Sequence, residues 1–333
     1  MDRFRFVLVG SGNISSTYAA AIANLPDAEI VGVVSRSGGC PDGVGSRICI
    51  APRIDAISVP FDAVILATPN GMHHSGAIEA ARLGKHVLTE KPLDISIKAM
   101  DAMEAACLDA GVTLAVCYQR RMSPDNQVMK ELLAGGALGR VYAADLSVKF
   151  YRDQAYYDSG AYRGTYAIDG GGPFVQQACH NIDLYAWFFG VPNRVVSMLS
   201  TMAHEMEAED HGAALLHHEN GMIGSIIAST LAKPGFAARL EIHAERGSVV
   251  MVDDVITHWS IEGINNPTRM GDYHTHDAAS SAAVDDTSGH EGVIRDFIDS
   301  IRQGREPASN STSARIATEL ILSIYGANIL GSS

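Results

Sequence analysis

The chain has 333 residues, of which 47% are hydrophobic and 19% are charged, and its formal net charge is -13 at pH 7. Such a composition supplies a large apolar core, and the length predicts roughly two domains. The negative charge argues against nucleic acid or an anionic membrane as a partner. No apolar run approaches the roughly 20 residues of a membrane span, and the chain opens directly into a strand without a signal peptide, so we expect a cytoplasmic protein.

The five cysteines are scattered and contain no C-x-x-C pair; they are Cys40, Cys49, Cys107, Cys117 and Cys179. Neither a disulfide framework nor a zinc site is therefore indicated. The adjacent His73 and His74 do not change this expectation, because neighbouring residues on a helix diverge by about 100° and rarely chelate one ion together. We expect no metal.

The first third of the chain alternates short β-rich runs with alanine-rich helical stretches. The strand-like runs are 6–9, 29–34, 63–66, 86–89 and 113–117, and the helical stretches are 17–24, 75–83 and 98–109. This alternation is typical of βαβ units and predicts a parallel sheet.

From about Arg140 the pattern changes to strand-like runs joined by Gly, Asn and Pro turns. These runs are 141–150, 195–202, 212–217, 222–230, 238–244 and 248–252. They predict a largely antiparallel sheet. Helical segments near 291–302 and 314–330 close the chain, and we place the domain boundary between residues 121 and 122.

The first predicted strand ends in a glycine-rich turn, Gly10-Ser11-Gly12-Asn13-Ile14-Ser15. It fits G-x-G-x-x-G with serine in the third glycine position, follows a strand and precedes a helix, which is the context that supports the motif. Gly10 permits a tight turn and Gly12 lets the backbone approach a pyrophosphate. We expect Gly10, Gly12, Asn13 and Ile14 to bind a dinucleotide at the N-terminus of the helix.

The end of the second predicted strand selects the cofactor. Ser35, Arg36 and Ser37 stand where an acidic residue would hold a ribose 2'-hydroxyl. Two hydroxyls and a guanidinium are suitable donors for a phosphate. The alternative is that Arg36 merely stacks on adenine. We favour NADP(H) over NAD(H).

Two further strand ends carry polar groups to the same sheet edge. Thr68-Pro69-Asn70 follows one strand, and Glu90-Lys91-Pro92 follows the next. Ligands bind at the carboxyl edge of such sheets. Pro92 disfavours a helical conformation at Lys91, so this lysine should lie on extended backbone. An ordinary solvated turn is the alternative interpretation of Glu90-Lys91-Pro92.

The second domain has its own polar cluster, which begins at Gly170-Gly171-Gly172-Pro173. We expect a helix over 174–189, because glycines followed by proline are typical of a turn that enters a helix. On that helix Gln176, His180 and Asp183 would share one face. A core histidine bonded to Asp183 would give the same pattern, but the flanking residues 162–166, Tyr-Arg-Gly-Thr-Tyr, favour a substrate pocket.

These motifs, in this order, together with Gln119-Arg120-Arg121 and the segment 296–307, resemble the glucose-fructose oxidoreductase, inositol dehydrogenase and rhizopine-catabolism (Gfo/Idh/MocA) family. The resemblance implies a doubly wound Rossmann domain, residues 1–121, and an α/β domain with an open antiparallel sheet, residues 122–333. It implies a homodimer or homotetramer formed through that sheet. It also implies hydride transfer between a nicotinamide and a sugar, cyclitol or related polyol.

The same resemblance implies roles for individual residues. Lys91 becomes the active-site lysine and His180 the acid/base, with His73, Glu90, Lys91 and Gln119 beside the cofactor. Candidate substrate contacts are Lys91, Tyr118, Tyr151, Arg163, Asp169, Gln176, His180 and the loop 272–276. The family commonly has aspartate where Gln176 stands. Some branches that act on sugar nucleotides carry an amide at this place, as this chain does. A redox-assisted glycoside-cleaving enzyme or a non-catalytic cofactor sensor of the same fold remain alternatives.

Overall fold

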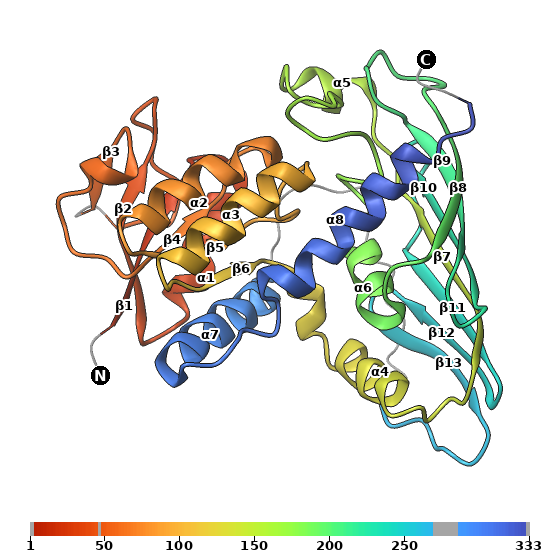
Figure 1. Cartoon of the computed structure of the whole chain (residues 1–333). Coiled ribbons are helices and arrows are strands. Elements are labelled where there is room, and N and C mark those ends of the chain that lie inside the picture. The colour runs from red at the N-terminus through yellow and green to blue at the C-terminus, as the bar shows by residue number, and fades with distance from the viewer. Residues whose placement is uncertain (1–2, 46–47, 269–285, 331–333) are drawn as a thin grey trace. The chain divides into compact units, whose positions relative to one another are not determined.

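The computed structural model of the chain describes residues 3–45, 48–268 and 286–330 (Figure 1). The chain forms two compact units. The first comprises Met1–Gln119 and Ser281–Arg315, and the second comprises Arg120–Ser280 and Ile316–Ser333. Dividing the chain once, between residues 121 and 122, assigns 281–315 to the second domain, whereas the structure places this segment with the first unit.

The late segment belongs to the first unit because of the apolar face of α7 (Ser288–Gln303). The ring of Phe297 is fully buried, and its centroid lies 6.4 Å from that of Phe4 and 6.3 Å from that of Phe6. Both partners belong to β1 (Phe4–Val9), the first strand of the chain. The burial of this aromatic cluster therefore holds a late helix against the first unit.

The first unit is built on a six-stranded sheet. Its strands are β1, β2 (Ala28–Val34), β3 (Cys49–Ala51), β4 (Ala63–Leu66), β5 (His86–Thr89) and β6 (Leu114–Val116). Its helices are α1 (Asn13–Ala23), α2 (His73–Arg82), α3 (Ile97–Asp109) and α7, with short 3₁₀ turns η1 (Ile54–Ala56) and η2 (Asn70–Met72). A third 3₁₀ turn, η3 (Gln119–Met122), spans the division between the units.

All strands of this sheet are parallel, in the order β3-β2-β1-β4-β5-β6, so the predicted parallel sheet is confirmed. Helix α1 packs with α7, and α2 packs with α3 (Figure 1). The strand order reverses between β1 and β4, and ligands bind outside the carboxyl ends of the strands at such a switch point. Gly10 and Ala67 follow these two strands.

The second unit is built on a seven-stranded sheet. Its strands are β7 (Val141–Lys149), β8 (Arg194–Ser200), β9 (His211–His217), β10 (Ile223–Ser229), β11 (Arg239–Ala244), β12 (Gly247–Val252) and β13 (Val255–Ile261). Its helices are α4 (Pro124–Ala134), α5 (Gln154–Asp158), α6 (Cys179–Phe189) and the later part of α8 (Ser311–Gly326).

The strands are ordered β13-β12-β11-β7-β10-β9-β8, and every neighbouring pair is antiparallel except β7 with β10. The predicted, mostly antiparallel sheet is therefore confirmed. Helices α4, α6 and α8 lie on one face, and none of the described helices covers the other (Figure 1). In β9, Leu216 faces the helices and is buried, whereas its neighbour Leu215 points outward and is exposed. Across the described residues no helix combines the length and hydropathy of a membrane span.

Candidate functional site

The glycine turn after β1 leaves the N-terminus of α1 open. Gly10 has a φ of +119°, and a Cβ there would stand 2.4 Å from the carbonyl oxygen of Ala67, so only glycine fits. Gly12 is the N-cap of α1, and a Cβ on this residue would have no described atom within 4 Å. No side chain caps the helix, and its first turn has no acidic residue. The free N–H groups and the positive end of the helix dipole suit a pyrophosphate.

A chain of hydroxyl groups joins this turn to the end of β2. The Oγ of Ser35 lies 3.2 Å from that of Ser11 and 3.3 Å from that of Ser37. Arg36 is exposed and forms no ion pair with any residue that the structure describes. The strand end therefore offers hydroxyl donors and a cation, as the sequence predicts.

The loop after β4 is supported from inside the protein by His73. This imidazole is fully buried, with Nδ1 2.9 Å from the carbonyl oxygen of Pro92 and Nε2 3.0 Å from that of Thr68. Burial lowers the pKa of His73, so the ring is neutral and donates to one carbonyl at a time. His73 thus joins the loops after β4 and β5, and its contact with the cofactor stays a prediction.

The outer residues of the same loop are better placed for a ligand. Thr68, Pro69 and Asn70 are half-buried. The hydroxyl of Thr68 has no hydrogen-bond partner among the described residues. A buried hydroxyl of this kind is available to a bound molecule.

Glu90 is buried directly before Lys91. Its carboxylate accepts from the hydroxyl of Tyr18 at 2.7 Å and from the N–H of Lys91 at 3.2 Å. Potential ligand atoms of Glu90, Cys117 and His290 lie within 4.8 Å of one another. Burial raises the pKa of the Cys117 thiol well above its usual value and lowers the pKa of His290. A protonated thiol is a poor metal ligand, so a hydrogen-bonded cluster is the better interpretation.

In the second unit the glycine turn is longer than predicted. The predicted helix over 174–189 is wrong for its first five residues, which belong to the turn. Helix α6 begins at Cys179, because the carbonyl of Pro173 accepts from the N–H groups of both Gln177 and Ala178 and closes a separate turn. Gln176 lies in this turn, and its side-chain amide donates to the carbonyl of Asp169 at 2.8 Å. Gln176 and His180 therefore belong to different elements.

Asp183 has a different role from the one the sequence suggested. Its two carboxylate oxygens accept from Nε and Nη2 of Arg121 at 2.8 and 2.6 Å, and both side chains are about 1% exposed. The carboxylate of Asp183 is therefore bound by Arg121, and a structural role for His180 stays an alternative. His180 lies half-buried in the first turn of α6. Arg121 is the residue that sequence reasoning missed, although it belongs to the Gln119-Arg120-Arg121 motif.

The remaining predicted substrate contacts separate by unit. Tyr118 is fully buried at the end of β6 in the first unit, where Lys91 also lies. In the second unit, Arg163 places its guanidinium carbon 4.4 Å from the ring centroid of Tyr156. Asp169 is buried there and accepts from the N–H of Gly164 at 3.0 Å. Tyr151 is half-buried, and the loop 272–276 lies outside the described residues.

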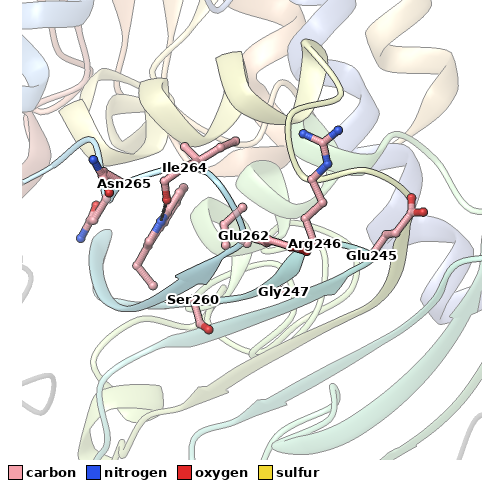
Figure 2. Close-up of a pocket in the computed structure, with 10 residues that line it drawn as sticks. Glu245, Arg246, Gly247, Ser260, Glu262, Ile264 and Asn265 are labelled. Carbon is pink, nitrogen blue, oxygen red and sulfur yellow. Dashed lines mark hydrogen bonds between the residues drawn. The ribbon is translucent and has the colours of Figure 1, made fainter.

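A hollow of about 690 Å³ opens at the end of β13, and the turn between β11 and β12 contributes to its wall. Its lining includes Glu245, Arg246, Ile264 and Asn265 (Figure 2). None of the predicted site residues within the described part of the chain lines it.

The strand order 3-2-1-4-5-6 and the glycine turn with an uncapped helix at the switch point define a dinucleotide-binding Rossmann protein with a second α/β domain. The family comparisons agree. Residues 4–118 match the model described as "Oxidoreductase family, NAD-binding Rossmann fold", and residues 126–250 match the GFO/IDH/MocA C-terminal domain. The chain belongs to the Gfo/Idh/MocA family and is an oxidoreductase of its NAD(P)-dependent dehydrogenase type.

Several relatives are similar over most of the chain. Inositol 2-dehydrogenase of Rhizobium meliloti is 25% identical over 327 residues, covering 94% of each chain. The WlbA dehydrogenase of Bordetella pertussis, solved with NADH and UDP-GlcNAcA, is 29% identical with a TM-score of 0.82, covering 98% of this chain and 96% of that one. The scyllo-inositol 2-dehydrogenase (NADP(+)) IolW of Bacillus subtilis is 25% identical over 63% of this chain and 55% of its own.

Proposed function

We propose that this protein transfers hydride between a nicotinamide and a carbinol or carbonyl carbon of a sugar, sugar derivative or cyclitol. The observation that carries the proposal is the sheet edge of the first unit, where the glycine turn and Lys91 follow strands of one parallel sheet. Names of the relatives support the substrate class, and the UDP-GlcNAcA complex of WlbA extends it to charged sugar conjugates. Residues 1–121 would bind the dinucleotide and residues 122–333 the substrate.

The reaction needs a proton acceptor and a cation near the reacting oxygen. A nicotinamide cofactor held at the glycine turn would supply the acceptor for the hydride of the carbinol carbon. His180 takes the hydroxyl proton in the oxidation direction, because imidazole is the side chain that suits a general base near neutrality. Lys91 stabilises the negative charge that develops on the oxygen. Gln176 and Arg163 hold substrate hydroxyl or anionic groups.

Replacing His180 with asparagine should lower kcat for oxidation roughly 10²- to 10⁴-fold, because the general base is lost. The wild-type rate should rise with pH as the imidazole deprotonates, and the variant should lose this rise. Steady-state rates across pH with myo-inositol and UDP-sugar acids measure both effects. His258→Asn, at an exposed position of β13, is the matched control and should behave as wild type. An unchanged rate and pH profile in His180→Asn would remove His180 from the reaction.

Replacing Lys91 with methionine should abolish most turnover while the dissociation constant of the cofactor stays within a few-fold, since the charge acts on the reacting oxygen. Fluorescence titration with reduced cofactor and kcat measurements separate the two quantities. Lys98→Met, at an exposed position of α3, serves as the control. Wild-type kcat in Lys91→Met would return Glu90-Lys91-Pro92 to a structural turn.

We also propose a preference for NADP(H) over NAD(H). Its support is the set Ser35, Arg36 and Ser37, because the exposed guanidinium and neighbouring hydroxyls suit a 2'-phosphate. Relatives of both kinds occur, since IolW is named for NADP(+) and WlbA was solved with NADH.

The Arg36→Ala variant should bind NADPH about tenfold more weakly and NADH nearly unchanged, because a charge-assisted contact to phosphate is lost. Isothermal titration calorimetry with both cofactors measures this difference. Arg82→Ala, at an exposed position at the end of α2, keeps the same change in net charge and should have no effect. Tighter binding of NADH than of NADPH by the wild type would contradict the proposal.

We further propose that the uncovered face of the second sheet joins subunits into a homodimer or homotetramer. The face carries exposed apolar side chains on neighbouring strands, namely Tyr142 (50% exposed), Val196 (49%), Met198 (53%), Leu215 (62%) and Ile223 (58%). Leu215 of β9 pairs directly with Val196 of β8. Contiguous apolar surface of this kind marks interaction sites.

Replacing Leu215 with glutamate should shift the protein toward a smaller species, because a charge buried in an apolar interface is unfavourable. Light scattering after size-exclusion chromatography reports the mass. Leu108→Glu introduces the same charge at an 80%-exposed position of α3 and should leave the mass unchanged. A monomeric wild type, or a Leu215→Glu variant of unaltered mass, would argue against this face.

A further inference from the structure

Glu209, which directly precedes Asp210 and β9, is a buried carboxylate that the proposed reaction does not use. The residue is 2% exposed. Its Oε2 accepts from the N–H of Gly172 at 3.1 Å, and its Oε1 accepts from the N–H of Phe174 at 3.4 Å. The hydroxyl of Tyr325, in α8, donates to the same Oε1 at 2.9 Å. One carboxylate thus binds the glycine turn and the last helix of the chain.

The glycines of the turn are required by this packing. A Cβ on Gly172 would stand 1.8 Å from the carbonyl oxygen of Glu209, and a Cβ on Gly171 would stand 2.0 Å from the hydroxyl oxygen of Tyr325. Gly171 also has a φ of +142°. Side chains at these positions would push the turn away from both partners, so the glycine run allows close approach to Glu209 and Tyr325.

We propose that Glu209 is a positioning residue that holds the 170–173 turn, and through it Gln176 and the start of α6 with His180. The connection is continuous, because the N–H of Gln176 donates to the carbonyl of Gly172 at 3.0 Å and the N–H of Ala178 donates to that of Pro173 at 2.8 Å. This inference rests on the proposed function, since it assigns Gln176 and His180 to the substrate site. Tyr325 supports Glu209 from α8.

Glu209 is also the group of this cluster that changes charge near neutrality. Burial raises its pKa to about 7, against the hydrogen bonds from Tyr325 and the backbone, which lower it. The titratable groups that face it are the phenols of Tyr325, Tyr166 and Tyr157, and burial raises the pKa of each. They stay neutral where Glu209 titrates. The ionised carboxylate accepts all three bonds, so the turn is held firmly above pH 7 and loosened below it.

The first test needs no substrate. Because the pKa of Glu209 is higher in the folded protein than in the unfolded chain, its contribution to stability is present at low pH and lost as the pH rises through 7. Glu209→Gln lacks this loss. The difference in Tm, variant minus wild type, should therefore rise between about pH 4.5 and pH 7 and then level off. A difference that does not change with pH overturns the ionisation of Glu209.

Hydrogen–deuterium exchange then tests whether the turn is held. At about pH 8, where the carboxylate is ionised, peptides covering 170–178 should exchange faster in Glu209→Gln and in the milder Tyr325→Phe than in wild type, since the turn loses an acceptor or its support. Glu205→Gln removes an exposed carboxylate four residues away and is the matched control. Equal exchange in all four proteins overturns the positioning role, whether or not the protein is a dehydrogenase.

Rates in both directions link the turn to catalysis, with myo-inositol and its 2-ketone as probes. If His180 causes the pH dependence of the rate, the direction of that dependence reverses between oxidation and reduction, because the residue acts as a base in one direction and as an acid in the other. If Glu209 causes part of the pH dependence, the rate rises with pH through that limb of the profile in both directions. Tyr325→Phe should move that limb upward by about half to one pH unit, since its hydrogen bond favours the ionised form. Faster exchange with rates unaffected by either variant would overturn the link to catalysis and leave the proposed function standing.

Discussion

The second unit depends on one buried ion pair, between Arg121 and Asp183. Both charges are withdrawn from water, and the two parallel hydrogen bonds between them fix the angle of α6 against the chain that enters this unit. Removal of either partner would leave an uncompensated buried charge, which typically costs about 3–5 kcal/mol. The guanidinium also lies 5.4 Å from the ring centroid of Trp187 on the same helix. His180 stands in the first turn of the same helix.

The first unit follows a different constraint, the close approach of backbone at the switch point of its sheet. Gly10 must pass the carbonyl of Ala67 without a side chain, and this contact brings the loops after β1 and β4 together. Buried polar groups then hold the neighbouring loops. His73 joins the loops after β4 and β5, and Glu90 anchors the backbone of Lys91 against Tyr18. The exposed edge is therefore supported by a hydrogen-bonded layer beneath it.

Both units share one design, in which residues proposed to touch ligands stand on turns whose shape is set by buried polar partners. In the first unit those partners are neutral or hydrogen-bonded, as for His73 and Glu90. In the second, the partner is Glu209, whose ionised form is unfavourable in the core. Buried polar groups of this kind position functional loops at a cost in stability.

The sequence by itself determined the features that depend on local patterns. Alternating apolar runs defined both sheets, and the glycine turn after Val9 marked the dinucleotide edge, because strand periodicity and turn chemistry are read within a few residues. The Lys91 loop and the serine-arginine end of β2 were visible for the same reason. These segments could be named as candidates from the sequence. The preference between NADP(H) and NAD(H), in contrast, depends on how the end of β2 contacts the 2'-phosphate of a bound cofactor.

Only the tertiary structure decided the partners of buried polar groups. Asp183 pairs with Arg121, 62 residues away, and Glu209 binds Tyr325, 116 residues away. No local pattern encodes such pairings, since they arise when distant elements bury polar groups that must then be satisfied. The same reason explains why α7 packs on β1 and why α6 starts at Cys179. The local sequence determines where helices, strands and turns form. The burial of polar and aromatic groups between these elements determines which distant residues come into contact.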